Sequence, residues 1–176
     1  MTITTEPPPS PESWGPVRSR TVHWHDPKVS LEAAPGRTGL EFLSAMVDGE
    51  IPGAPIAGLM NMRPVQVAAG DVVFVCVPDE SMYNPIGMVH GGVACTLLDT
   101  AAGCAVHSTL AEGVGYTSIE IKINYLRPIH AHTGELTVHG WVTKPGRRVA
   151  FAEADIRDAD GALLATATST CLVIGG

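Results

Sequence analysis

Alternating apolar and polar residues are clearest in the stretch TSIEIKINY, residues 117–125, where three isoleucines and a tyrosine alternate with polar side chains. A period of two is typical of a half-buried strand, so we expect these four side chains to face a core. The same kind of pattern predicts five more strands, over residues 62–68, 71–77, 135–143, 147–157 and 162–173. The turns at Gly70, residues 144–146 and residues 158–161 are of hairpin length, which indicates antiparallel neighbours.

Two segments have the residues of helices instead. Thr38 and Glu41 match a capping box ahead of an amphipathic run, which predicts a helix over residues 39–48 that ends at Gly49. The Pro and Gly residues that follow predict a loop. From residue 91 to 106 small and apolar side chains lie all round, so a helix there is expected to be buried.

The order of these elements is two strands, one buried helix and four strands with short links. It predicts an antiparallel sheet curled round a central helix, in the α+β class. We expect residues 37–176 to form this one domain, because 176 residues suffice for one core and are few for two. Residues 1–36 are expected to be a disordered or irregular extension, since their first part is rich in Pro, Ser, Thr and Glu.

Composition narrows the classes of function. The net charge of −7 argues against binding to nucleic acid or to an anionic membrane surface. The N-terminus lacks the apolar stretch of a signal peptide, and no apolar run is long enough for a bilayer, so we expect a cytoplasmic protein. The four cysteines have neither metal-site spacing nor the density of a disulfide scaffold, and are expected to be reduced core residues: Cys76, Cys95, Cys104 and Cys171.

Asp99 is the single charged residue of MVHGGVACTLLDTAAG, residues 88–103. Burying an unpaired charge is costly, so we favour a functional role over a structural ion pair. His90 lies nine residues earlier, which on a helix means about 13.5 Å of rise and about 180° of rotation. The two side chains of one chain therefore point to opposite sides. A site that used both would need a second subunit, related by a twofold axis.

Gly91 and Gly92 follow His90 at the predicted start of this helix. The first N–H groups of a helix are unpaired, and glycine lets a ligand oxygen approach them. Such a turn can form an oxyanion hole, which holds the charge that develops on a carbonyl oxygen. The two glycines are equally well explained by close packing of the helix start against the sheet, so both interpretations stay open on this motif alone.

A spaced set of residues extends the pattern beyond the helix: Asn84-Pro85, Gly87, His90-Gly91-Gly92, Leu98-Asp99 and Ser118. The set resembles that of the PaaI-like acyl-CoA thioesterases of the hotdog fold, and the resemblance covers about residues 39–176. It implies a long helix wrapped in an antiparallel sheet. It also implies homodimers, often doubled to homotetramers, with active sites at the subunit interface.

The resemblance implies a role for each site residue and requires no metal or cofactor. The thioester carbonyl would rest on the Gly91 N–H group with help from Asn84. Asp99 of the other subunit would activate water as general base, or attack directly as nucleophile. Ser118 would help to hold the water, and His90 would support the departing thiolate or hold Asn84. Some relatives carry glutamate in place of Asp99. The resemblance therefore does not decide whether Asp99 acts as general base or as nucleophile.

Coenzyme A carries phosphates, which an acidic protein must bind with a local basic patch. Arg147 and Arg148 lie next to the predicted turn at residues 144–146, and guanidinium groups suit phosphate. A solvated turn explains these charges equally well. His130 and His132 have no acidic or cysteine partners near them in the sequence, so we do not expect a metal site there.

The sequence thus predicts an acyl-CoA thioesterase that hydrolyses an aryl- or medium-chain acyl thioester to the acid and free coenzyme A. One alternative is a non-catalytic acyl-CoA or lipid-binding protein on the same fold, which would not need Asp99. Another is a hotdog dehydratase or hydratase, which would need a His and acidic pair that the sequence does not display.

Overall fold

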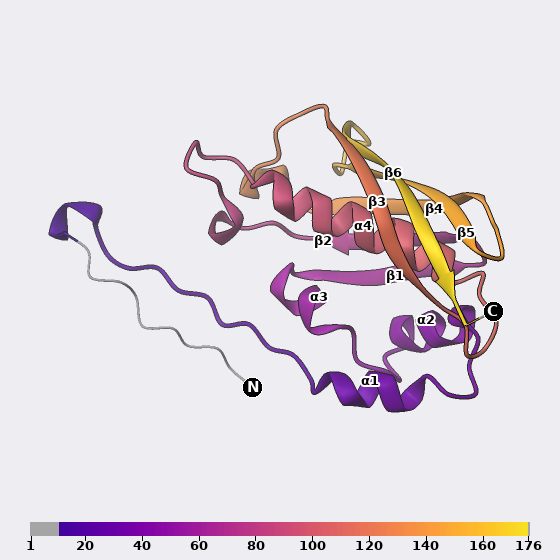
Figure 1. Ribbon diagram of the computed structural model, residues 1–176. Coiled ribbons are helices and arrows are strands. Elements are labelled where there is room, and N and C mark those ends of the chain that lie inside the picture. Colours follow the sequence, from indigo (N-terminus) through magenta and orange to yellow (C-terminus); the bar gives the residue numbers. More distant parts are fainter. Residues whose placement is uncertain (1–10, 176) are drawn as a thin grey trace.

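A six-stranded antiparallel sheet curls round one long helix, α4 (Gly91–His107), in the computed structural model, which describes residues 11–175 (Figure 1). The strand order is β1-β2-β4-β5-β6-β3. The strands are β1 (Met62–Ala68), β2 (Asp71–Cys76), β3 (Gly115–Tyr125), β4 (Leu136–Lys144), β5 (Val149–Arg157) and β6 (Leu163–Ile174). The predicted α+β class and antiparallel sheet around a central helix are confirmed.

Three shorter helices lie on the β1 side of the domain: α1 (Pro27–Ala33), α2 (Gly39–Val47) and α3 (Pro55–Leu59) (Figure 1). The start of α2 is the predicted capping box, in which the Thr38 hydroxyl accepts from the Glu41 N–H group and the Glu41 carboxylate accepts from the Thr38 N–H group. The sequence predicted neither α1 nor α3. Both begin with proline, which is favourable in a first helical turn. The loop that the Pro and Gly residues after Gly49 predict is thus wrong for residues 55–59, which form α3.

The 3₁₀ turns are η1 (Glu12–Trp14), η2 (Glu80–Met82) and η3 (Ala131–Thr133). The predicted N-terminal extension contains α1 and an extended arm, residues 15–26, drawn in indigo and purple in Figure 1. Residues 1–10, for which disorder was predicted, lie outside the described part. No helix within residues 11–175 is long and apolar enough to cross a membrane.

Small residues bring α4 into backbone contact with the sheet. A Cβ atom on Gly140 of β4 would lie 2.3 Å from the carbonyl oxygen of Ala101, so only glycine fits there. Leu97 and Leu98 of the same helix are almost completely buried and fill the space between α4 and the strands. The small, apolar composition of α4 is therefore explained by close packing inside the curled sheet.

The expectation that α4 is buried all round is wrong for one face. Exposed or partly exposed positions recur every three or four residues and form a stripe, called the uncovered stripe below: Gly92, Cys95, Thr96, Asp99 and Thr100. Within residues 11–175, the sheet does not close over this stripe because β3, which lies beside it, is an edge strand with β6 as its one partner strand. In a single chain, Asp99 is thus a partly exposed carboxylate and not a charge in a dry core.

β3 also departs from simple alternation. Ile121 and Ile123 pack against the core as predicted, but Ile119 is 56% exposed and Tyr125 is 58% exposed. The register with β6 shifts between Ser118 and Glu120, and this bulge turns Ile119 outward. Tyr125 is the last residue of the strand, where the sheet no longer covers it.

The two edges of the sheet are protected differently. β1 carries Pro64, which has no N–H group to donate, and it packs against α2 and α3. β3 is eleven residues long, and no other strand of residues 11–175 pairs with its outer edge. An exposed edge of this length is suited to pair with another chain.

Candidate active site

The loop between η2 and α4 is held by the side chain of Asn84. Its Oδ1 atom accepts hydrogen bonds from the N–H groups of Ile86, at 3.1 Å, and Met88, at 3.2 Å. The backbone N–H group of Asn84 donates to the Met88 carbonyl at 2.7 Å, which closes the loop. No hydrogen bond of the Asn84 Nδ2 group is found within residues 11–175, so that group is available as a donor.

His90 is the N-cap of α4, a role that the sequence did not indicate because histidine is not a preferred N-cap residue. Its Nδ1 atom accepts a hydrogen bond from the Gly92 N–H group at 2.8 Å, so the proton of the neutral ring is on Nε2. No hydrogen bond found within residues 11–175 uses the Gly91 N–H group. That N–H group, at the positive end of the helix dipole, is therefore free to bind a ligand oxygen.

Both glycines are closely approached by neighbouring side chains in this turn, so a larger residue would require His90 or Tyr125 to shift. A Cβ atom on Gly92 would lie 2.9 Å from His90 Nδ1, and one on Gly91 would lie 3.2 Å from the Tyr125 hydroxyl. That hydroxyl donates to the Gly91 carbonyl at 3.1 Å and so ties the helix start to the end of β3. The sequence placed Tyr125 only in an alternating strand; its position at the helix start depends on a contact between residues far apart in the chain.

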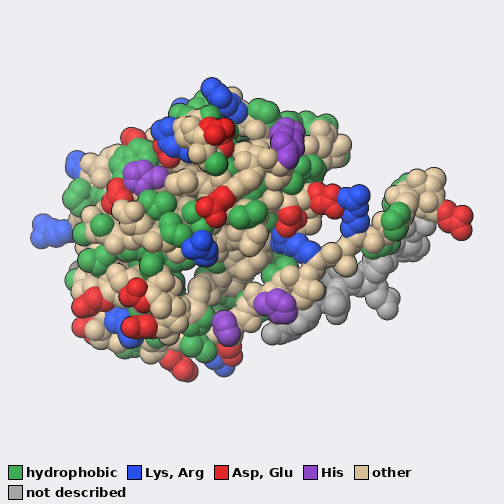
Figure 2. Space-filling model, turned by 180° about the vertical axis from the view of Figure 1, so that it is seen from behind, with side chains coloured by type: hydrophobic (Ala, Val, Ile, Leu, Met, Phe, Trp, Pro, Cys, Tyr) green, Lys and Arg blue, Asp and Glu red, His purple; other side chains and the backbone are tan. Residues whose placement is uncertain are grey.

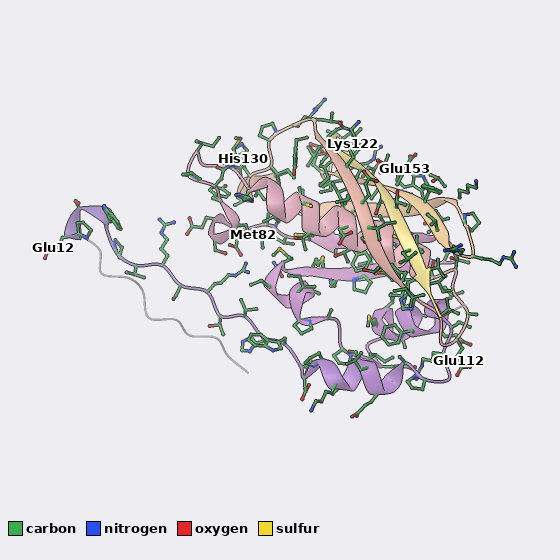
Figure 3. All side chains as sticks on the ribbon, in the orientation of Figure 1. Glu12, Met82, Glu112, Lys122, His130 and Glu153 are labelled. Carbon is green, nitrogen blue, oxygen red and sulfur yellow. The ribbon has the colours of Figure 1, made fainter. Side chains whose placement is uncertain are left out.

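A cavity of about 420 Å³ opens beside this turn. Asn84 and Gly91 both line it, which is the pair of residues for which the family resemblance implied a joint role. The rest of its wall is mostly apolar: Met88, Val89, Ala94, Tyr125, Leu126, Arg127, Pro128, Ile129 and Ala165. Met82 and His130 lie at the same end of α4 (Figure 3).

Asp99 lies farther along α4 and is paired with β3. The Ser118 hydroxyl donates to Asp99 Oδ1 at 2.7 Å. This is the one hydrogen bond found to the Asp99 carboxylate among the described residues, so Oδ2 is open. The structure therefore brings Asp99 and Ser118 together, which the sequence implied only through the family resemblance.

Neutral groups surround this pair. Burial raises the pKa of the Tyr116 hydroxyl well above its usual range and raises the pKa of the Cys104 thiol to about 12. Burial also raises the pKa of the Cys171 thiol, which lies directly across from Ser118 on β6. These groups stay protonated near neutral pH, so the Asp99 carboxylate lies among neutral side chains.

The two halves of the predicted site do not meet in one chain. Asp99 comes eight residues after Gly91, which corresponds to about 12 Å along the helix axis. It is not among the residues that line the cavity at Gly91. The hydrogen bond found for the His90 ring goes to Gly92, within its own turn, and not to Asn84 or Asp99.

Arg147 and Arg148 line a different cavity, of about 740 Å³, beyond the C-terminal end of α4. Thr109, Leu110 and Val114 form part of its wall, and it shares no lining residue with the cavity at Gly91. One chain therefore does not bring these arginines to the helix start.

His130 and His132 stack on each other, with ring centroids 4.8 Å apart, and His130 Nδ1 lies 3.1 Å from the Gly87 carbonyl oxygen. In the part of the chain that the structure describes, no three His, Cys, Asp or Glu side chains come together as a metal site requires. All four cysteines are free. The histidine pair therefore helps to shape the loop that carries Asn84.

Comparison with known proteins gives the family. The model of the thioesterase superfamily matches residues 86–165. Human acyl-coenzyme A thioesterase 13 is 32% identical over 108 residues, which cover 60% of this chain and 75% of the relative. The chain belongs to the thioesterase superfamily. It is thus a thioester hydrolase, as the sequence predicted.

Solved structures agree with this assignment of a hotdog thioesterase fold. A phenylacetic acid degradation-related protein from Ralstonia eutropha is 31% identical, with a TM-score of 0.67, and the match covers 74% of this chain and 98% of that one. A Streptococcus mutans protein solved with acetyl-CoA bound is 27% identical, with a TM-score of 0.60, over 65% of this chain and 90% of that one. The predicted hotdog thioesterase fold is confirmed.

Proposed function

We propose that this thioesterase hydrolyses an aryl- or medium-chain acyl-CoA to the free acid and coenzyme A, at sites shared between two chains. The observation that carries the proposal is the division of the site. Gly91 and Asn84 offer free donors beside a mostly apolar cavity, whereas Asp99 and Ser118 offer a base about 12 Å away along the helix. Each half lacks what the other supplies.

A twofold pairing of two chains would join these halves. The outer edge of β3 is free, and the uncovered stripe of α4 that contains Asp99 lies next to it. Pairing of two β3 edges would cover this stripe and would bring Asp99 of one chain toward Gly91 of the other. Two identical sites would result, each with residues from both chains.

The chemistry follows from the free atoms. Asp99 Oδ2 accepts a proton from a water molecule, and the water oxygen attacks the thioester carbonyl carbon. The carbonyl oxygen becomes an oxyanion, which the Gly91 N–H group and the Asn84 Nδ2 group stabilise. The carbonyl then re-forms as the carbon–sulfur bond breaks, and the departing thiolate takes up the proton that Asp99 removed from the water, which returns Asp99 to its carboxylate form. Ser118 orients the carboxylate, and the Nε2 proton of His90 is available to support the thiolate.

Direct attack by Asp99 is the alternative, and a single turnover in ¹⁸O-labelled water separates the two mechanisms. If Asp99 is the base, the label enters the product acid in the first turnover. If Asp99 is the nucleophile, the thiolate leaves as an anhydride forms between the acyl group and Asp99, and water attack at the Asp99 carbonyl carbon puts the label into Asp99. Label in Asp99 therefore identifies the nucleophile, because the base mechanism never labels the enzyme. Mass spectrometry of the acid and of the peptide that contains Asp99 reads both outcomes.

The coenzyme A phosphates require cations, and Arg147 and Arg148 are our candidates. They lie at the far end of α4 from Gly91 in the same chain. In a shared site they would therefore come from a different chain than the Gly91 that holds the carbonyl. Their guanidinium groups are permanently charged and match phosphate geometry. Names such as acyl-coenzyme A thioesterase 13 among the relatives support coenzyme A as the carrier.

The test is release of free thiol from a panel of acyl-CoAs, including phenylacetyl-CoA and octanoyl-CoA, by wild type and Asp99→Asn. Loss of the base is expected to lower kcat by about 10²- to 10⁴-fold. Asp160→Asn, in the exposed turn before β6, is the matched control and is expected to act like wild type. Thiol release that survives in Asp99→Asn would contradict the role of Asp99. Binding without release by wild type would favour the acyl-CoA-binding alternative.

A further inference from the structure

The N-terminal arm, residues 15–26, is attached to the segment that leads into the active site. Arg20 Nη1 donates to Asp79 Oδ2 at 2.5 Å, and its second Nη group donates to the Leu59 carbonyl. The Arg20 side chain is 27% exposed and that of Asp79 is 40% exposed. Figure 2 shows the arm from behind, with basic and acidic side chains in contact where it meets the body.

A second contact holds the arm closely against α3. A Cβ atom on Gly58 would lie 2.5 Å from the His23 carbonyl oxygen, so the backbone of the arm touches the backbone of the helix. Arg18 also pairs with Glu80, but these side chains are 75% and 54% exposed, and such ion pairs contribute little. Arg20 and the contact at Gly58 therefore fix the arm, and Arg18 adds little.

Asp79 connects the arm to η2, which leads into the candidate site. Its Oδ1 atom caps η2 by accepting from the Ser81 N–H group at 2.7 Å. Burial raises the pKa of Asp79, but the hydrogen bonds from Ser81 and Arg20 outweigh burial and hold the pKa below its usual value, so the carboxylate is charged at neutral pH. At the end of η2, the Met82 carbonyl accepts from the His90 N–H group at 2.8 Å.

We propose that Arg20 is a positioning residue: through Asp79 and η2 it holds the segment of residues 80–92, which carries Asn84 and the Gly91 turn. Three hydrogen bonds in series, Arg20 to Asp79, Ser81 to Asp79 and His90 to Met82, connect the arm to the start of α4. The arm lies outside residues 86–165, the part that the superfamily model matches. The consequence for catalysis rests on the proposed function.

Matched substitutions separate this role from general stability. Arg20→Gln removes the charge, and Gly58→Ala pushes the arm away from α3 without touching any site residue. The controls are Arg18→Gln, which removes an exposed ion pair, and Gly53→Ala, whose Cβ atom would make only an ordinary contact at 3.8 Å. Arg20→Lys keeps the charge and tests rescue.

Hydrogen–deuterium exchange of the amides of residues 80–92 measures the positioning directly. Arg20→Gln and Gly58→Ala are expected to speed their exchange about fivefold or more, whereas the controls and Arg20→Lys stay near wild type. With phenylacetyl-CoA or octanoyl-CoA, whichever is cleaved, the first two variants should lower kcat about 10- to 100-fold with little change in KM.

Unchanged exchange in Arg20→Gln would overturn the proposal, and so would faster exchange with kcat intact. A wild type that cleaves no acyl-CoA would refute the proposed function instead. In that case the exchange measurement alone still decides whether Arg20 holds the segment, since it needs no substrate.

Discussion

At the scale of single residues, the hydrogen bonds in the two half-sites determine which atoms are free to react. The Oδ1 atom of Asn84 accepts hydrogen bonds within the loop, which leaves its Nδ2 group free, and the Nδ1 atom of His90 accepts from the Gly92 N–H group. The Oδ1 atom of Asp99 accepts a hydrogen bond from the Ser118 hydroxyl, and its Oδ2 atom is open. One half therefore keeps three free donors, the Gly91 N–H group, Asn84 Nδ2 and His90 Nε2, and the other half keeps one acceptor, Asp99 Oδ2. Water attack on a thioester needs donors for the oxyanion and an acceptor for the proton of the water.

Ser118→Ala removes the hydroxyl that orients Asp99. A hydrogen bond to a charged group contributes about 1.5–3 kcal/mol, so we expect kcat to fall about 10- to 100-fold while KM changes little. Thr117→Ala, at the preceding exposed position of β3, is the control. Steady-state thiol release from an acyl-CoA measures both variants, and equal kcat values for the two would contradict the role of Ser118.

The paired substitution Arg147→Gln and Arg148→Gln tests the phosphate contact. We expect KM for an acyl-CoA to rise about tenfold with kcat nearly unchanged, because phosphate binding is the same in the ground state and the transition state. The matching N-acetylcysteamine thioester has no phosphates, and its kcat/KM should not change. A similar loss with both substrates would show that the arginines act on the fold and not on phosphate.

At the scale of elements, the sequence predicted those whose pattern is local. All six strands and α4 were found to within about two residues at each end, because period-two alternation and turn residues are written into short stretches. The bulge at Ser118 and the open face of α4 were missed, since both depend on how β3 sits at the edge of the sheet.

For the candidate site, the sequence supplied the residues, and their roles remain predictions. The spacing of Asn84, the glycine turn and Asp99 is a feature of the chain itself, and the structure shows Asn84 and Gly91 on one cavity. The contact of Tyr125 with Gly91 and that of Arg20 with Asp79 join residues 34 and 59 positions apart. No local sequence pattern indicates such contacts, so they could be identified only from the three-dimensional structure.

Gly140→Ala tests the close contact of α4 with β4. The new Cβ atom would lie 2.3 Å from the Ala101 carbonyl oxygen, and the helix would have to move. We expect the free energy of unfolding to fall by about 2–3 kcal/mol. Gly115→Ala, with no atom within 4 Å of the new Cβ atom, is the control in urea denaturation. Equal midpoints for the two variants would contradict the packing argument.

At the scale of the whole molecule, the central claim is that each chain contributes one half of each of two active sites. Its basis is the free β3 edge, the uncovered stripe with Asp99 and the separation of Asp99 from Gly91 along α4. The opposite edge of the sheet is covered by helices and interrupted by Pro64, so it is less suited to pairing. The architecture therefore favours a dimer that pairs two β3 edges over one that pairs two β1 edges.

The most direct test uses mixed dimers of Asp99→Asn and Asn84→Ala chains that carry different affinity tags. Each variant alone is expected to be nearly inactive. In the mixed dimer, the Asp99→Asn chain supplies Asn84 and Gly91, and the Asn84→Ala chain supplies Asp99, so one of the two sites is intact. Thiol release from the doubly purified mixed dimer should reach about half of the wild-type kcat. If each chain instead held a complete site, the mixed dimer would be as inactive as its parents, and that result would contradict the account.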